Sequence, residues 1–535
     1  MKPIPLTYAD AVPLLLYLAA ILFTGWHLRR RMVSTDAFLL AGRSLPSWVT
    51  GIAFVAANCG ALEVMGVVST SAKYGARANH FYWVGAVPAM LFLALFMMPI
   101  YHRSRVRSVP EFLKMRFGEK TRAFNAASFA VLMVLVSGIS LYAMAIVLGS
   151  ILGWSFGTSV IAGAGVVLVY VFLGGLRATI YNEVLQFVLI VVGFAPLSFM
   201  ALREFGGFSG LGAALPEHLR HTWKGMAVVD PMTATMDGFG TVIGLGFVLS
   251  FGYWCTDFLL VQRALAAKDL PAAVETPLIA SVAKLFFPLL VVVPGLAAFA
   301  LFPAELNARY DLALPQLMLR YYGPGLLGLG ITAMLASFMS GMAGNITAFN
   351  TVWTYDLYQA YVAPGRSDRH YLLVGRVATV AAVLLACGTA TIVLRFNSLM
   401  DYVQLLFSFF NAPLFATFLL GMFTKWATPA GGLWGLVTGT LGALGHYLAL
   451  RAGLVHYGSD MTANFYGAAF GWGVCLAVTA VVSAFTKRKP EAELEGLVYD
   501  GRTGGAAHER ARLGRAKWLA AAVAAVLLLL NWLFY

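Results

Sequence analysis

Apolar runs of roughly 20 residues recur along nearly the whole chain, and they constrain its fold more than any other feature. A hydrocarbon core about 30 Å thick requires about that length of helix to cross it. The composition agrees, because 60% of the 535 residues are hydrophobic and only 11% are charged, unlike an average soluble domain. The runs therefore predict a polytopic membrane protein built from transmembrane helices.

Fourteen such runs can be placed, mostly separated by short polar connectors. Their centres lie near residues 18, 58, 90, 137, 167, 191, 250, 290, 338, 384, 411, 440, 475 and 525. The first run has no small-residue cleavage site, so we expect a retained span rather than a signal peptide. The longest remaining pieces, 202–238 and 487–517, are too short for an independent enzyme core and carry no catalytic constellation.

The basic residues are unevenly distributed among the connectors. If the N-terminus is outside, the inner connectors hold 26 of the 37 Lys and Arg residues, the outer ones hold 10, and Lys284 falls inside a span. Positive loops tend to stay cytoplasmic, so this count predicts a plasma (inner) membrane protein with both termini outside. The net charge of +13 is then mostly a topology signal. Because the basic residues form no face interleaved with aromatic residues, nucleic acid is not an expected partner.

The stretch "FVAANCGALEVMG" interrupts the second run with Asn58, Gly60 and Glu63. Helix propensity is poor there, which predicts a break. Unwound backbone at membrane depth is tolerated only when it is buried in protein or lines a wet cavity, so the break is a candidate ion or solute site. Alternatively, Gly60 and Ala61 only let a neighbouring helix approach closely. Glu63 favours the first interpretation, because ionisable groups inside membranes are costly and usually functional.

A second interrupted run lies five spans further on. "GLGFVLSFGYWCTDFLLVQR" mixes Gly244, Ser250 and Asp257 into apolar sequence. An odd number of spans per unit inverts the second unit, and transporter folds place broken helices at matching positions of inverted repeats. This predicts an all-α membrane protein with a five-plus-five inverted-repeat core. The expected parts are a peripheral first span (1–44), a first half (45–204), an outer loop (205–238), a second half (239–427) and peripheral C-terminal spans (428–535).

The ninth run, "GITAMLASFMSGMAGNITAFN", is rich in small and hydroxyl residues. Ser337, Ser340, Gly341 and Gly344 share one helix face by their spacing. One interpretation is a stripe for helix packing. The other is a hard-cation site, in which serine hydroxyls meet carbonyls freed by the break in the second run, since oxygen ligands suit sodium and other hard cations.

Several longer motifs make the chain resemble the sodium/solute symporter family, and its sodium/glucose branch in particular, over essentially its full length. They are "FLGGLRATIYNEVLQ" with Glu183, "YWCTDFLLVQRALAAKD", "GRVATV", "FLLGMFTKWATPAGGLWG" and the terminal "LNWLFY". The resemblance implies a ten-helix inverted-repeat core that alternates access around a central site. It also implies solute uptake driven by Na⁺ as the coupling ion.

The resemblance also implies cation-binding residues. Ala56 and Cys59 match the positions whose carbonyls bind sodium, and Ser337, Ser340 and Gly341 match the ninth-span positions of that site. Gly341 is a departure, because the family usually has a hydroxyl there. Glu183 occupies a place where relatives have aspartate, which implies a possible second cation or proton site.

Only some of the family's sugar-binding positions are matched by the same kind of residue in this chain. Tyr253 matches the aromatic inner gate, and polar sugar contacts match Ser250, Lys284 and Gln404. Glu63 stands where glucose relatives have His or Gln, and Tyr82 stands where they have a sugar-binding glutamate.

Three of these positions have alternatives. Lys284 could snorkel to the cytoplasmic interface, and Tyr82 could belong to an interfacial aromatic belt. Glu63 either lines the solute cavity, in place of the carboxylate that Tyr82 replaces, or forms an internal ion pair with Lys284.

A secondary transporter accounts best for the two interrupted spans, the polar ninth run and the motifs. A membrane enzyme would need a nucleophile or metal motif, and the sequence has no His-Glu-x-x-His, Gly-x-Ser-x-Gly or phosphate-binding loop. A passive channel would not need an inverted pair of broken helices. The expected partners are the bilayer and a small polar solute, with a monosaccharide first and a carboxylate or amino acid, coupled to sodium or protons, as the alternative.

Overall fold

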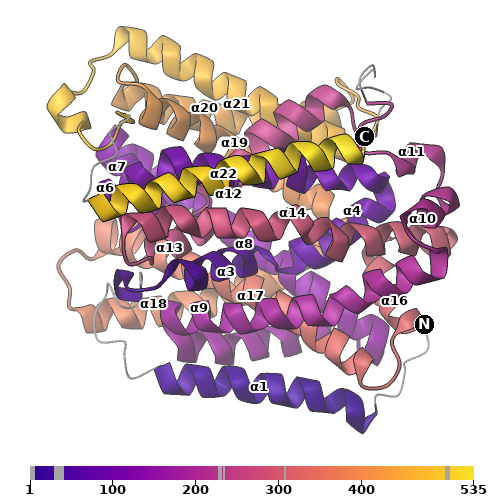
Figure 1. Cartoon of the computed structure of the whole chain (residues 1–535). Helices are drawn as coiled ribbons and strands as arrows, with labels where there is room; N and C mark the ends of the chain where they lie inside the picture. Colours follow the sequence, from indigo (N-terminus) through magenta and orange to yellow (C-terminus); the bar gives the residue numbers. More distant parts are fainter. Residues whose placement is uncertain are drawn as a thin grey trace.

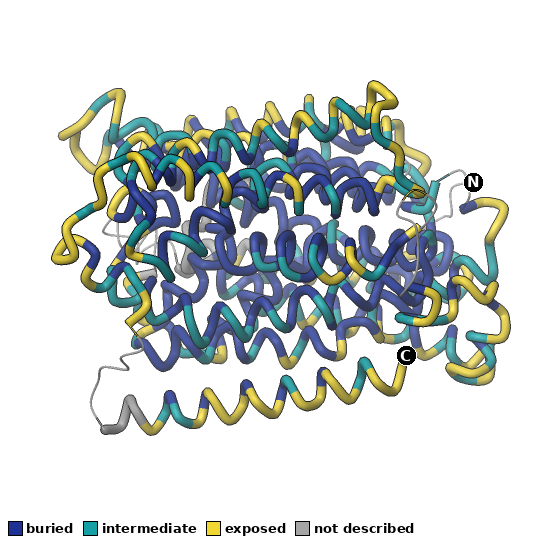
Figure 2. The backbone as a smooth tube through the Cα atoms, turned by 90° about the horizontal axis from the view of Figure 1, so that it is seen from above, coloured by how far each residue is buried: buried dark blue, intermediate teal, exposed yellow. Residues whose placement is uncertain are grey.

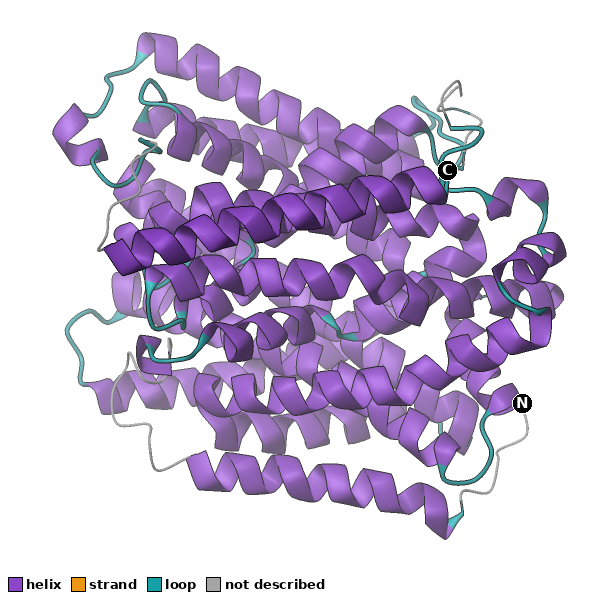
Figure 3. Cartoon of the chain, viewed as in Figure 1, coloured by secondary structure: helices purple, strands orange, loops and turns teal. Residues whose placement is uncertain are grey.

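The computed structural model describes residues 7–28, 41–226, 232, 235–306, 309–396, 398–500 and 507–535. These residues form helices joined by loops and contain no β-strand (Figure 3). The basic stretch 29–31, part of the first inner connector, lies outside the described residues.

Ten helices in the described chain are long and apolar enough to cross a membrane. They are Phe81–Arg103, α8 (Glu119–Leu152), Thr179–Phe205 within α9 (Phe156–Phe205), α14 (Leu270–Leu301), Leu326–Val362, α18 (Asp368–Val393), α19 (Leu399–Phe423), α20 (Pro429–Arg451), α21 (Asp460–Phe485) and Ala511–Leu533 within α22 (Ala507–Leu533). Two bent pairs raise the number to twelve: Ser47–Asn58 with Leu62–Asn79, and Gly240–Thr256 with Phe258–Leu265. Two shorter apolar helices, Tyr8–Ile21 and Phe156–Leu168, cover the remaining predicted runs.

All fourteen predicted runs therefore fall on helices, but the fifth and sixth belong to the single helix α9.

The remaining helices and helical segments are α1 (Tyr8–Leu28), η2 (Ala41–Arg43), α3 (Ser47–Asn58), η3 (Leu62–Gly66), α4 (Val67–Tyr74), η4 (Gly75–Asn79), η5 (Phe81–Ala86), α5 (Val87–Phe92), η6 (Leu93–Met97), α6 (Met98–Arg103), α7 (Val109–Phe117), α10 (Phe208–Ala214), α11 (Glu217–Arg220), η7 (Gly240–Ser250), α12 (Phe251–Thr256), α13 (Phe258–Leu265), α15 (Pro303–Leu306), η8 (Tyr310–Leu312), α16 (Ala313–Tyr321), α17 (Leu326–Thr351), η9 (Val352–Val362) and η10 (Glu491–Leu494).

Both predicted breaks are present. The second span bends by 58° between α3 and η3, where Cys59 and Gly60 separate the two helical pieces. The seventh span bends by 49° between α12 and α13. The bend there lies at Asp257, which has extended backbone angles and caps α13 by accepting a hydrogen bond from the Leu259 N–H at 2.9 Å. Capping satisfies a backbone donor that the break exposes.

The helices run alongside one another in one bundle, and the start of α1 and the C-terminus lie at the end of the bundle that carries α10 and α11 (Figure 1). The α6–α7 region, which belongs to a predicted inner connector, lies at the opposite end. Burial separates the core from the periphery (Figure 2). The most apolar part of Leu326–Val362 is 83% buried, whereas the corresponding parts of α20 and α22 are 22% buried. The ninth run is therefore central, and the last spans are peripheral.

Helices α20 and α21 pack closely because glycines face the contact. Gly431, Gly435 and Gly439 recur every fourth residue along α20, the spacing that brings membrane helices together. A Cβ atom at Gly439 would lie 2.7 Å from Cys475 Cβ and 2.9 Å from the Gly471 carbonyl oxygen. No side chain larger than hydrogen fits there without moving the helices apart.

Replacing Gly439→Val should therefore lower the free energy of unfolding by about 1–3 kcal/mol, the usual cost of overpacking. The matched control is Gly445→Val on the same helix, where an added Cβ meets no atom within 4 Å. Thermal unfolding of the purified protein measures both variants. Equal melting temperatures for the two would contradict the close packing of α20 on α21.

Candidate functional site

A small central cavity lies where the two bent spans meet α19. Its volume is about 60 Å³, and it is lined by Asn58, Leu62, Glu63, Val67, Phe81, Tyr82, Ala86, Leu245, Leu249, Ser250, Tyr253, Trp254, Met400, Val403, Gln404 and Phe407. Ligand sites usually enclose about 300–1,000 Å³, so this cavity must widen to admit an organic solute. Five of the six residues predicted to bind solute line it, and the sixth, Lys284, contacts it through Glu63.

A buried polar network connects these residues. Lys284 Nζ lies 2.5 Å from Glu63 Oε1 and 2.5 Å from Asn58 Oδ1. The Tyr82 hydroxyl donates to Glu63 Oε1 at 2.6 Å, and Asn58 Nδ2 donates to the Tyr253 hydroxyl at 3.1 Å. Glu63 is therefore held by two donors from two other helices.

The network decides between the alternatives left open by the sequence. Lys284 is fully buried, with its ammonium 4.3 Å from the Phe287 ring centroid, so it does not snorkel to an interface. Tyr82 is buried and bonded to Glu63, so it does not belong to an aromatic belt. Asn58 bridges the ammonium and the Tyr253 hydroxyl, a role that sequence reasoning missed because it treated Asn58 only as a helix breaker.

The five residues predicted to bind sodium are brought together at the break. The Ser337 hydroxyl donates to the Cys59 carbonyl oxygen at 2.7 Å, and the Ser340 hydroxyl donates to the Ala56 carbonyl oxygen at 3.1 Å. Two carbonyl and two hydroxyl oxygens thus converge from α3 and α17. Such neutral oxygen donors suit a hard cation like Na⁺, so the residues fit the expected ion.

The departure at Gly341 has a steric reason. A Cβ atom at Gly341 would lie 3.0 Å from the Cα atom of Gly60, and a Cβ at Gly60 would lie 3.0 Å from the Cα of Gly341. The close helix approach predicted for the "NCGA" stretch is therefore present, and it is compatible with an ion site at the same place. The paired glycines let α17 approach the break, and the approach places the serine hydroxyls against the carbonyls.

Glu183 lies in a separate buried ion pair with Arg263, and both side chains are fully buried. Arg263 also donates to the Leu259 carbonyl oxygen at 2.7 Å. The guanidinium already compensates the carboxylate, so a cation or proton role for Glu183 requires Arg263 to move. The sequence did not identify this partner, because Arg263 lies 80 positions away and was counted as a topology residue.

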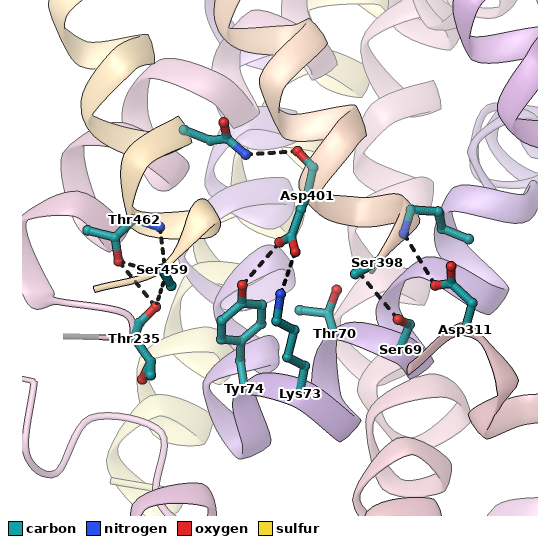
Figure 4. Close-up of polar contacts among 12 residues, drawn as sticks. Ser69, Thr70, Lys73, Tyr74, Thr235, Asp311, Ser398, Asp401, Ser459 and Thr462 are labelled. Atoms are coloured by element: carbon teal, nitrogen blue, oxygen red, sulfur yellow. Dashed lines mark hydrogen bonds and ion pairs between the residues drawn. The ribbon is translucent and has the colours of Figure 1, made fainter. Parts of the chain in front are cut away.

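A third ion pair, between Lys73 and Asp401, joins α4 to α19 (Figure 4). Lys73 Nζ lies 2.6 Å from Asp401 Oδ2, and the Tyr74 hydroxyl donates to Asp401 Oδ1 at 3.1 Å. The Ser69 hydroxyl also donates to the Ser398 hydroxyl at 3.3 Å. These contacts join α4 to the start of α19.

A larger cavity of about 610 Å³, the outer cavity, lies on the other side of this contact. Lys73 and Asp401 line it together with residues at the ends of α20 and α21, among them Arg451 and Asp460. Helices α4 and α19 line the central cavity through Val67 and Gln404 and the outer cavity through Lys73 and Asp401. The ion pair therefore stands between the two cavities.

Two bent spans that meet at a polar cavity, beside a group of oxygen donors suited to a cation, define a cation-coupled membrane transporter. The comparison with protein families agrees. The chain belongs to the sodium:solute symporter family, whose family model matches residues 38–439.

Similar proteins are sodium-coupled carriers. The chain is 29% identical over 458 residues to a "Sodium/glucose cotransporter" of Vibrio parahaemolyticus, covering 81% of this chain and 84% of that protein. It is 30% identical over 470 residues to "Sodium/myo-inositol cotransporter 2" of Oryctolagus cuniculus, covering 81% and 68%. The predicted transporter class and Na⁺ as coupling ion are thereby confirmed.

Solved structures support the fold. The structure resembles a Na⁺-coupled sialic acid symporter in a substrate-bound outward-open state, with a TM-score of 0.78, 18% identity and coverage of 90% of this chain and 99% of that one. It also resembles a nucleobase-cation-symport-1 family transporter in a closed conformation, with a TM-score of 0.51, 11% identity and coverage of 86% and 97%. The predicted all-α transporter fold is confirmed.

The buried pair of Glu63 and Lys284 predicts a large effect of Glu63→Gln. The substitution keeps the side-chain shape but leaves a buried ammonium without a counter-charge, which should lower the free energy of unfolding by about 3–5 kcal/mol. Thermal unfolding without sodium or solute measures it.

Two variants serve as controls. Tyr82→Phe removes one hydrogen bond but keeps the ion pair, and should cost about 1 kcal/mol. Adding Lys284→Met to Glu63→Gln removes the stranded charge and should restore most of the stability. A Glu63→Gln protein as stable as the wild type would show that Lys284 does not depend on Glu63.

Proposed function

We propose that this sodium symporter takes up a neutral polyhydroxylated solute, a monosaccharide being the first candidate, through the central cavity. The main support for this proposal is the ion pair of Glu63 and Lys284. The two charges neutralise each other inside the protein, so the cavity offers hydrogen-bonding groups rather than a net charge. The names of the similar sodium/glucose and sodium/myo-inositol cotransporters support a solute of this class.

A carboxylate or amino acid solute is the alternative, and the charges argue against it. A buried carboxylate needs a cationic partner, and the only ionised group among the cavity-lining residues is Glu63. Lys284 would have to leave Glu63 to receive an anion.

A polyol needs only donors and acceptors. The Ser250 hydroxyl makes no hydrogen bond to another described residue, and Gln404 has only a weak contact, 3.4 Å, to the Met400 sulfur. Both groups are free to bind solute hydroxyls.

In this proposal the cation binds the Ala56 and Cys59 carbonyls and the Ser337 and Ser340 hydroxyls, with Gly341 allowing their approach. Binding there would hold the break in the second span against α17. Because Asn58 and Glu63 flank the break and line the central cavity, sodium binding and the shape of the solute site are coupled.

The uptake of labelled D-glucose and myo-inositol into proteoliposomes tests the function. An inward sodium gradient should drive accumulation above the outside concentration, and collapsing the gradient should abolish accumulation. Excess unlabelled amino acid or carboxylate should not compete. Accumulation of such charged solutes, with no accumulation of either polyol, would overturn the proposal.

In the same assay, Ser340→Ala should raise the sodium concentration for half-maximal uptake by roughly tenfold or more, because losing one buried polar partner costs about 1–3 kcal/mol. Ser408→Ala is the matched control, since its hydroxyl only bonds the Leu405 carbonyl within its own helix. An unchanged sodium dependence in Ser340→Ala would place the ion elsewhere.

We also propose that both termini face the outside of a plasma (inner) membrane. The basic-residue count supports the outside orientation. The start of α1 and the end of α22 lie at the same end of the bundle, which supports placing both termini on one side of the membrane (Figure 1). A single cysteine added after Tyr535 should react with an impermeant maleimide in intact cells, whereas one at Glu491 should react only after permeabilisation. All four native cysteines would first be replaced by serine or alanine. The reverse pattern would invert the topology.

A further inference from the structure

We propose a second sodium site at Asp257, in a small cavity between the breaks of the two bent spans. This cavity, called the Asp257 cavity here, has a volume of about 20 Å³. Its polar lining residues are Asn58, Ser140, Tyr253, Asp257 and Asn345. They come from α3, α8, the α12–α13 bend and α17, so the cavity joins both halves of the predicted repeat.

Several polar side-chain atoms that line the cavity have no hydrogen-bond partner among the described residues. Asp257 is 2% exposed, and its Oδ2 atom has no hydrogen-bond partner. The side chains of Ser140 and Asn345 are also buried and make no hydrogen bond to another described residue. Buried polar groups are almost always bonded, so three unpartnered ones around one cavity indicate a bound species.

The charge balance shows which species fits. Nearby cations are already committed, since Arg263 pairs with Glu183 and Lys284 pairs with Glu63. The described residues contain no ion-pair partner for Asp257 within 4.0 Å. The only nearby positive charge that acts on Asp257 among the described residues is that of Arg263, which is in direct contact with Glu183. A buried carboxylate without a direct partner is costly, and a monovalent cation supplies one. Carboxylate, hydroxyl and amide oxygens are the ligands that hard cations prefer.

The size of the cavity fits one small ion. A volume of 20 Å³ exceeds the roughly 10–15 Å³ that a single water molecule requires. It leaves no space for an organic solute.

The Asp257 cavity is distinct from the predicted sodium site. None of the four oxygen donors of that site, from Ala56, Cys59, Ser337 and Ser340, comes from a residue that lines the cavity. Both sites lie beside Gly341, because a Cβ there would stand 3.8 Å from the Ser140 hydroxyl oxygen. The protein therefore has two neighbouring cation positions, one without and one with a carboxylate.

The cavity also adjoins the solute site. Asn58, Leu62, Tyr253 and Phe407 line both the Asp257 cavity and the central cavity. An ion at Asp257 thus contacts the wall of the solute site directly. The second ion would tighten that wall and couple ion occupancy to solute binding.

Equilibrium binding of radioactive ²²Na⁺ to the purified full-length protein tests the proposal without any solute, so its outcome does not depend on which solute is carried. The wild-type protein should bind two Na⁺ ions. Asp257→Asn should lose one of them, by an affinity loss of at least about 10–100-fold, a range typical of disturbed metal sites. Asparagine remains a good N-cap residue for α13, so the fold should survive.

Ser140→Ala is the second variant, because it changes neither the charge nor the cap of α13. It should weaken the same ion by about tenfold, the cost of one buried polar partner. Ser340→Ala should instead weaken the other ion. Combining Asp257→Asn with Ser340→Ala should abolish measurable binding.

One Na⁺ per chain in the wild type, or two in both Asp257→Asn and Ser140→Ala, overturns the second site. Wild-type binding of a single ion that is lost in Ser340→Ala would overturn the Asp257 site while leaving the first sodium site intact. Two wild-type ions with a loss in Asp257→Asn, and no uptake of either polyol, would support the ion site and reject the proposed solute.

Discussion

The structure depends on one constraint: inside a membrane, backbone groups freed by a helix break must find partners within the protein. At the second-span break, the Ser337 and Ser340 hydroxyls bond the carbonyls of Cys59 and Ala56. At the seventh-span break, the Asp257 carboxylate caps α13. The groups that stabilise the breaks are the same groups that suit a cation. These hydrogen bonds satisfy backbone groups at both breaks without an ion.

Charge imposes a second constraint, because an uncompensated ion is costly in a low-dielectric interior. Three ion pairs in and around the candidate site join separate helices: Glu63 with Lys284 beside the central cavity, Glu183 with Arg263 of α13, and Lys73 with Asp401 at the outer cavity. The Lys73 pair is the most exposed of the three, since its lysine is 19% exposed. Water in the outer cavity can therefore solvate the charges of this pair more readily than those of the other two pairs.

The sequence predicted the parts that depend on local chemistry. Gly60, Asn58 and Asp257 mark the breaks because their side chains disfavour a helix or compete for its backbone, and the hydroxyl spacing in the ninth run predicted the serine face. Partners distant in sequence were predicted only in part. The pair of Glu63 with Lys284 was one of two alternatives for Glu63, whereas the pair of Lys73 with Asp401 was not predicted. Lys284 lies 221 positions from Glu63, and Lys73 lies 328 positions from Asp401. The sequence around Lys73 does not distinguish this lysine from a topology residue. The merging of two predicted spans into α9 was also missed, because the polar stretch between two apolar runs does not show whether the chain turns or continues as helix.

Gly341 shows how a missing ligand can follow from packing rather than from lost function. A hydroxyl residue at this position would bring its Cβ to 3.0 Å from the Gly60 backbone and push α17 away from the break. Glycine keeps the Ser337 and Ser340 hydroxyls within hydrogen-bonding distance of their carbonyls, and it opens space next to Ser140. In the proposed scheme with two cations, the oxygen that Gly341 lacks is offset by the close contact at the first site and by the adjoining Asp257 cavity, which contains a carboxylate. Because that cavity shares Asn58 and Tyr253 with the central cavity, the same scheme couples ion binding to solute binding.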